Sequence, residues 1–168
     1  TYGDWSSDVC SSDLQIKTAI RAWFLERDFL EVDPCCLRSS PGNEAHIHAL
    51  STEILGPDLT KRKLYLHTSP ELSMKKLLAA GERKIFYLGP CFRNRERGAL
   101  NTTEFTMLEW YRVEDSYEKL MEDAAELLRL ACTSTGQKFV SWQGRTANPQ
   151  DPIVSLSVSE AFSRYAGI

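Results

Sequence analysis

The stretch 84–112 constrains the fold of this chain more than any other part of its sequence. It contains two apolar runs of strand length, 84–92 and 104–112, joined by a loop rich in arginine. Since side chains alternate across a strand, the second run places large apolar residues on both of its faces. One face carries Phe105, Met107, Glu109 and Tyr111. The pattern predicts a hairpin buried on both faces, with a carboxylate that needs a partner.

The predicted hairpin also gathers side chains that a nucleotide and an amine would require. An aromatic ring, a carboxylate and a phenol share one face, and the loop adds Arg93, Arg95 and Arg97. ATP and lysine together offer the flat ring, the phosphates and the cationic end that suit this set. In the alternative, Glu109 is a solvated residue of an amphipathic strand, which would leave large apolar groups in water. The pattern alone leaves a functional and a structural Glu109 open.

Length and composition restrict the class of protein. A chain of 168 residues can bury one good core. Its net charge of −3 gives no general basic surface for nucleic acid. The sequence shows no apolar run long enough to span a membrane and no secretory signal, so we expect a cytoplasmic protein with no membrane partner.

The cysteines and histidines do not follow a metal-binding pattern. The five cysteines show neither zinc-site spacing nor a disulfide framework. Cys35 and Cys36 are predicted to be reduced core residues, since they are adjacent within an apolar stretch. His46 and His48 share one face of a predicted strand and are interpreted as surface or hydrogen-bonded residues. We therefore expect no metal site among these side chains.

The segment 1–14 does not fit the pattern of the rest of the chain. It nearly repeats Ser-Ser-Asp, lacks a periodic apolar face, and resembles a translated sequencing adapter. A disordered tail is the alternative interpretation, and the segment is left out of the fold in either case. The folded domain is expected to comprise 15–168.

Hydrophobic periodicity and turn residues predict the remaining elements. Helices are expected from Gln15, from Ser69 as N-cap with Pro70 in the first helical position, from the Asp115–Glu118 capping-box spacing, and over 155–165. Strands are expected at 29–37, 45–55, 64–66, 84–92, 104–112 and 138–142, with a polar loop at 58–63. The third helix should bury Leu120, Met121, Ala124, Leu127, Leu128 and Ala131. Because the strands form hairpins, the fold class is α+β, an antiparallel sheet flanked by helices.

Three segments carry a specific resemblance: Thr-Ser-Pro-Glu at 68–71, Cys-Phe-Arg-Asn at 91–94, and Glu-Phe-Thr-Met-Leu-Glu-Trp-Tyr at 104–111. They resemble class II lysyl-tRNA synthetases, and most of all the shortened paralogue that attaches lysine or (R)-β-lysine to elongation factor P. The segment 29–34 resembles motif 1 of that family, and the hairpin resembles motif 2. The resemblance implies a homodimer and a partial catalytic domain, with motif 3 and the Mg²⁺ ligands beyond residue 168. We expect this half to be inactive alone.

The resemblance also implies roles for individual residues. By motif position, Arg93 is the catalytic residue and also binds ATP, together with Asn94, Arg95, Thr102 and Phe105. The substrate amino acid would be held by Ser69, Pro70, Glu71, Glu109 and Tyr111. The chain departs from the family at Arg95, where Glu is usual, and at Thr102, where Asn is usual. Two alternatives stay open: Glu96 replaces that glutamate, or the loop uses Arg95 on the phosphates.

The implied activity is ATP-dependent formation of a lysyl or (R)-β-lysyl adenylate and transfer of its acyl group to a lysine side chain of elongation factor P. A lysyl-tRNA synthetase is the first alternative, and a synthetase-like binding protein without catalysis is the second. Transfer RNA ranks behind elongation factor P because the basic residues gather at the predicted ATP loop instead of along a groove.

Overall fold

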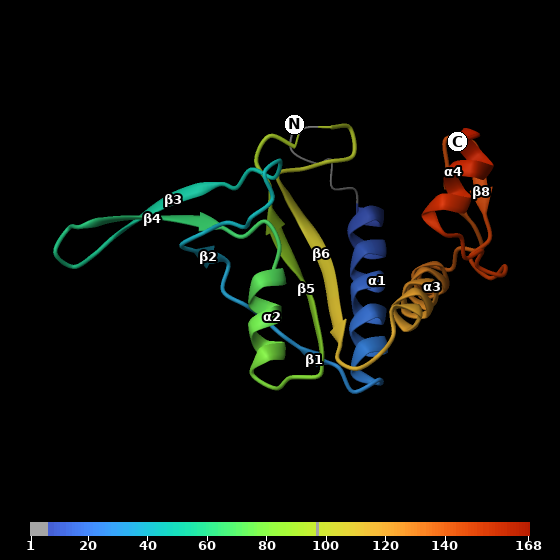
Figure 1. The fold of residues 1–168 in the computed structure, drawn as a ribbon, viewed down its shortest axis with the longest axis horizontal. Coiled ribbons are helices and arrows are strands. Elements are labelled where there is room, and N and C mark those ends of the chain that lie inside the picture. The colour runs from blue at the N-terminus through green and yellow to red at the C-terminus, as the bar shows by residue number, and fades with distance from the viewer. Residues whose placement is uncertain (1–6, 97) are drawn as a thin grey trace. The chain divides into compact units, whose positions relative to one another are not determined.

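The computed structural model describes residues 7–96 and 98–168, so the predictions for 1–6 and for Arg97 lie outside it. The chain forms two compact units (Figure 1). One unit comprises Arg21–Asp115, and the other combines the residues up to Ile20 with Ser116–Ile168. Helices and antiparallel strand pairs occur together, which confirms the predicted α+β class.

A long hairpin is the centre of the first unit. Strands β5 (Lys84–Phe92) and β6 (Glu104–Arg112) are antiparallel and pair over their whole lengths, with Tyr87 opposite Glu109. Their bounds are those predicted from the sequence. The short strand β1 (Leu30–Glu31) adds to β5 in parallel and completes a three-stranded sheet.

Both faces of the hairpin are covered, as predicted. On one face, helix α2 (Glu71–Ala79) contributes Met74 to a buried cluster with Ile85, Tyr87 and Cys91, against which Phe105, Met107 and Tyr111 pack. On the other face, the Phe24 ring of helix α1 (Ser7–Leu25) stacks on Phe86 at 4.5 Å between centroids. The alternative that leaves the Glu109 face of β6 in water is therefore wrong.

One glycine of the hairpin serves a close approach. Positions 87 and 89 lie on the same face of β5, and the Tyr87 ring lies over Gly89. The Tyr87 hydroxyl donates a hydrogen bond to the Pro90 carbonyl at 2.7 Å. A Cβ at position 89 would lie 2.7 Å from the ring of Tyr87, which is buried. The buried tyrosine therefore requires a residue without a side chain at this place.

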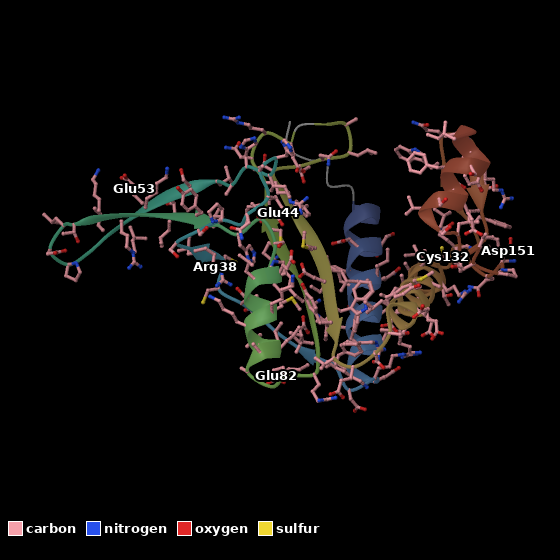
Figure 2. The ribbon with its side chains drawn as sticks, viewed as in Figure 1. Arg38, Glu44, Glu53, Glu82, Cys132 and Asp151 are labelled. Carbon is pink, nitrogen blue, oxygen red and sulfur yellow. The ribbon has the colours of Figure 1, made fainter. Side chains whose placement is uncertain are left out.

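A second sheet extends as a ribbon from the same unit. It has the order β2 (Leu37–Arg38), β4 (Lys61–Leu66), β3 (Ser51–Leu55), all antiparallel. Side chains project from both sides of the ribbon, Glu53 among them (Figure 2). The strand predicted over 29–37 is wrong, because it splits into β1 and β2 around Pro34, which has no N–H to donate. The predicted loop 58–63 is also too long, since its last three residues pair with β3.

The N-cap residue of α2 is Pro70 and not the predicted Ser69. Ser69 Oγ accepts a hydrogen bond from the Glu71 amide at 3.3 Å, although the helix begins one residue later than predicted. Gly81 adopts φ +114° and ends the helix, and the Glu82 amide bonds back to the Leu77 carbonyl. A positive φ after the last helical turn favours glycine.

The second unit departs more from the predictions. Helix α3 (Tyr117–Ser134) begins after Ser116, not Asp115. Its buried residues are Asp123, Ala125, Leu127 and Cys132, whereas Met121, Ala124 and Leu128 of the predicted apolar side are exposed. Of the predicted apolar side only Leu127 is fully buried, since periodicity does not decide which part of a stripe is covered.

The remaining elements of this unit are short. Strand β7 (Val140–Trp142) pairs with β8 (Arg145–Ala147), a strand that was not predicted, through a turn in which Gln143 and Gly144 both have positive φ. Helix α4 (Val158–Ala166) begins at a capping box formed by Ser157 and Glu160, later than the predicted start.

Two predictions about the N-terminal half need correction. Helix α1 begins at Ser7, so regular structure starts well before Gln15; serine and aspartate are favoured at helix starts. Cys35 is exposed and Cys36 half-buried, since the chain leaves the sheet after Pro34, while Cys91 and Cys132 are buried. These four cysteines are free.

We predict that Phe24→Ala destabilises the protein by about 3–5 kcal/mol, because the ring is fully buried against Phe86 and its removal leaves a cavity. The measurement is the shift of the urea midpoint. Leu55→Ala, on an exposed strand position, is the matched control and should change stability by less than about 0.5 kcal/mol. Equal shifts for the two variants would contradict the assignment of Phe24 to the core.

Candidate active site

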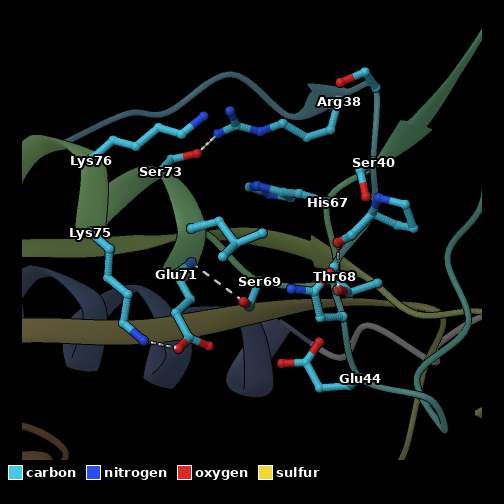
Figure 3. A pocket seen from close by; sticks show the side chains of 15 residues that line it. Arg38, Ser40, Glu44, His67, Thr68, Ser69, Glu71, Ser73, Lys75 and Lys76 are labelled. Atoms are coloured by element: carbon cyan, nitrogen blue, oxygen red, sulfur yellow. Dashed lines mark hydrogen bonds and ion pairs between the residues drawn. The ribbon is translucent and has the colours of Figure 1, made fainter.

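A pocket of about 370 Å³ lies where the N-terminus of α2 meets the loop that follows β2 (Figure 3). Cationic and anionic side chains both line it. Its walls include Arg38, Gly42, Glu44, Ser69, Glu71 and Lys75. Two of the predicted substrate-binding residues, Ser69 and Glu71, therefore line one pocket.

The turn that leads into α2 is fixed from two sides. Thr68 Oγ1 donates to the Pro41 carbonyl at 3.2 Å, which ties the turn to the preceding loop. Arg93 Nε donates to the Thr68 carbonyl at 3.2 Å, which ties it to the β5–β6 hairpin. Pro70 is fully buried, so its contribution in this structure is to packing. The predicted catalytic arginine and the predicted substrate turn are thus in direct contact.

Glu71 has a cationic neighbour on its own helix. Lys75 Nζ lies 2.5 Å from Glu71 Oε1, an i,i+4 pair at the pocket wall. The bond to Glu71 raises the pKa of Lys75, and the charges of Glu109 and Glu44 add to this effect. The ammonium of Lys75 thus stands in the field of three carboxylates.

Glu109 finds its partner on the same strand. Tyr111 Oη donates to Glu109 Oε1 at 2.5 Å, and both side chains are partly buried. Burial raises the pKa of the Glu109 carboxyl and the negative charge of Glu71 raises it further, against the opposing effect of the Tyr111 hydrogen bond. Burial and the Glu109 carboxylate also raise the pKa of Tyr111. Two carboxylates that repel one another near a phenol form a site that a cation would stabilise.

Arg93 and Phe105 lie against each other. The guanidinium carbon of Arg93 is 5.2 Å from the centre of the Phe105 ring, within the range of a cation–π contact. Glu96 approaches the same guanidinium at 3.9 Å. Phe105 is half-buried and also packs against the Met74 cluster. The ring therefore has a core contact and a face beside the predicted ATP-binding arginine.

The other predicted ATP-binding residues lie in or beside the loop between β5 and β6. The Asn94 amide bonds to the His48 carbonyl at 2.6 Å, and Asn94 Oδ1 accepts from the Arg95 amide at 2.9 Å. Arg95 adopts φ +66°, a conformation unusual for a residue with a side chain. Thr102 Oγ1 donates to the Glu104 carbonyl. These contacts shape the loop, and the ATP-binding role of its side chains stays a prediction.

Several polar residues of the site escaped the sequence analysis. Lys75 could have been found, because it follows Glu71 by one helical turn, but Glu44 carries no local signal. His67 is buried below the pocket, and its Nε2 lies 2.8 Å from the Pro90 carbonyl that also accepts from Tyr87. Burial raises the pKa of the Cys91 thiol to about 12, so this cysteine is protonated at neutral pH.

Two further findings concern the part of the chain that the structure describes. Its His, Cys, Asp and Glu side chains form no group of three or more suited to a metal ion. None of its helices combines the length and apolarity needed to cross a membrane.

The family model of class II tRNA synthetases (D, K and N) matches residues 6–168. This chain belongs to that family. The β5–β6 hairpin and the 68–71 turn, two of the segments that carry the resemblance, contact each other through Arg93.

Curated relatives of this class II chain include three named elongation factor P--(R)-beta-lysine ligase. The one from Vibrio cholerae is 38% identical over 148 residues, which cover 85% of this chain and 46% of the relative. The relative from Vibrio campbellii is 40% identical over 127 residues, which cover 75% of this chain and 39% of the relative. The relative from Salmonella arizonae is 38% identical over 154 residues, which cover 91% of this chain and 42% of the relative. The chain therefore spans less than half the length of these relatives.

We predict that Glu109→Gln stabilises the protein increasingly as the pH rises. A carboxyl whose pKa is raised by folding favours the native state while it is protonated, and this advantage is lost as the pH passes through its folded pKa. Below the ordinary value of 4.5 the variant and the native protein should be equally stable. Above the raised pKa the difference should reach a plateau.

Unfolding free energies measured by urea denaturation across this pH range test the prediction. The control is Glu53→Gln, which changes a well exposed carboxylate on the ribbon and should give a flat difference. A variant that loses stability as the pH rises would show that ionised Glu109 stabilises the fold.

Proposed function

We propose that this chain is part of a ligase that activates lysine or (R)-β-lysine with ATP and transfers it to a lysine side chain of elongation factor P. The observation that carries the proposal is the Glu109–Tyr111 pair beside Glu71, because these groups form an amine-binding site within a class II domain. The name of the relatives, elongation factor P--(R)-beta-lysine ligase, supports the choice of elongation factor P as acceptor.

The amine ends of the substrate meet the two carboxylates. Glu109 and Tyr111 hold the distal ammonium, and Glu71 holds the amino group near the substrate carboxyl, with Ser69 and Pro70 shaping the turn before it. A bound diamine relieves the repulsion between Glu71 and Glu109, and its charge-assisted hydrogen bonds to them are stronger than neutral ones. A monoamine could contact only one of the two carboxylates.

Activation joins the substrate carboxylate to the nucleotide. An oxygen of that carboxylate attacks the α-phosphorus of ATP, the bond from phosphorus to the bridging oxygen breaks, and pyrophosphate leaves. Negative charge grows on the α-phosphate oxygens during this step. Arg93, held by the Thr68 carbonyl and the Phe105 ring, supplies a preorganised guanidinium for that charge. Phe105 would also stack on the adenine, while Asn94, Arg95 and Thr102 contact the nucleotide.

Transfer completes the reaction. The amine of the acceptor lysine attacks the acyl carbon, an amide bond forms, and AMP leaves with the electrons of the broken bond while the amine loses a proton. Mg²⁺, which the family resemblance implies, would neutralise the phosphates when bound. The homodimer expected through the motif 1 region belongs to the same proposal.

Arg93→Ala in the complete protein should lose at least about 3 kcal/mol of transition-state stabilisation, roughly a hundredfold in rate, because a preorganised donor is removed. Lysine-dependent exchange of pyrophosphate into ATP measures this loss. Arg62→Ala, which removes an exposed arginine from the ribbon, is the matched control and should keep the native rate. Since Arg93 also holds the 68–71 turn, lysine binding by the variant is measured in parallel. A near-native exchange rate would remove Arg93 from its role.

The choice of acceptor is tested by incubating the complete protein with ATP, labelled lysine or (R)-β-lysine, and either elongation factor P or tRNA. We expect label on elongation factor P and poor charging of tRNA. A tRNA ligand needs many phosphate contacts, and the acidic composition of this chain offers few. Efficient tRNA charging without labelled protein would favour the lysyl-tRNA synthetase, which the family description also includes. Amine binding without pyrophosphate exchange would favour the binding protein.

A further inference from the structure

The loop after β2 brings one more carboxylate to the pocket. The hydrogen bond from Thr68 to the Pro41 carbonyl fixes this loop on the 68–71 turn. Gly42 adopts φ +151°, and a Cβ there would lie 2.9 Å from Glu44 Oε2. A residue with a side chain would therefore displace Glu44, which lines the pocket together with Glu71. In Figure 3 the two carboxylates lie on the same side of the turn.

The ammonium group of Lys75 lies close to these carboxylates. Lys75 Nζ is 2.5 Å from Glu71, and Lys75 lines the same pocket as Glu44. Both Glu44 and Glu109 act on the charge of Lys75 in addition to Glu71. The side chain of Lys75 thus places an ammonium group at the pocket wall, next to these carboxylates.

The carboxylates divide between two ends of the proposed substrate site. Glu44 and Glu71 line the pocket, whereas Glu109 and Tyr111 lie on the sheet and are absent from its wall. Under the proposed function, Glu109 and Tyr111 take the distal amine. The pocket end, with Glu44 and Glu71, is then left for the amino group near the carboxyl.

We propose that Glu44 is a specificity-determining residue that binds, together with Glu71, the amino group nearest to the substrate carboxyl. This inference rests on the proposed function and deepens it. A helix carries Glu71 and a loop carries Glu44, so the two carboxylates approach the amine from different elements. Selection for an amine near the carboxyl then depends on both, and selection for the distal amine depends on Glu109.

The test is a set of binding titrations by calorimetry on the complete protein, with three ligands. Lysine has both amines, 6-aminohexanoic acid lacks the amine near the carboxyl, and norleucine lacks the distal one. Glu44→Gln should weaken lysine and norleucine about tenfold, as for a lost charge-assisted contact, and leave 6-aminohexanoic acid unchanged. Glu109→Gln should weaken lysine and 6-aminohexanoic acid and leave norleucine unchanged. Glu53→Gln is the control and should change none of them.

Two outcomes would overturn the role of Glu44. Native affinity for lysine in Glu44→Gln would show that the carboxylate makes no contact with the ligand. Equal weakening of lysine and 6-aminohexanoic acid would reduce its effect to a general electrostatic one. If the native protein binds lysine and exchanges pyrophosphate, either result contradicts only the role of Glu44. The proposed function is then unaffected. Failure of the native protein to bind lysine overturns both. Thermal unfolding of Glu44→Gln, an exposed loop variant, checks that its fold is native.

Discussion

The pairing of β5 with β6 is the interaction on which the rest of the structure depends. Nine residues of each strand pair antiparallel, so Tyr87 lies opposite Glu109 and Cys91 opposite Phe105. A slip of one residue would turn Glu109 toward Phe24 and Phe86 and would move Phe105 away from Arg93. The same register buries aromatic rings on one face and collects the polar groups of the site on the other. Core packing and site geometry therefore come from one set of hydrogen bonds.

The site retains groups that work against stability. Burial and the nearby charge of Glu71 both disfavour the ionised form of Glu109, and the hydrogen bond from Tyr111 offsets only part of that cost. Lys75 supplies a cation to Glu71. Such an arrangement is expected where carboxylates serve ligand binding, because a substrate ammonium would offset the repulsion between Glu71 and Glu109. The opposite face of the sheet, with Phe24 stacked on Phe86, carries no comparable cost.

The errors of sequence interpretation have common physical causes. The strand expected over 29–37 breaks at Pro34, whose missing N–H interrupts the ladder. On α3, periodicity predicts an apolar side but does not decide which part of it is covered, and the structure buries Asp123, Ala125, Leu127 and Cys132 instead of the complete predicted set. The missed residue Glu44 lies on a loop whose conformation depends on Gly42 and on the hydrogen bond from Thr68. The break at Pro34 is a local effect, whereas burial on α3 and the position of the Glu44 loop depend on contacts with residues distant in sequence.

The sequence by itself determined the hairpin, its bounds, the face that Glu109 shares with Phe105 and Tyr111, and the helix that follows Ser69, because alternation and capping are local properties. Motif spacing also selected the residues that match a class II synthetase. Only the tertiary structure decided that Arg93 holds the 68–71 turn and that Glu44 joins the pocket. These contacts form between elements, or between a loop and a turn, and long-range packing sets their geometry while local periodicity does not.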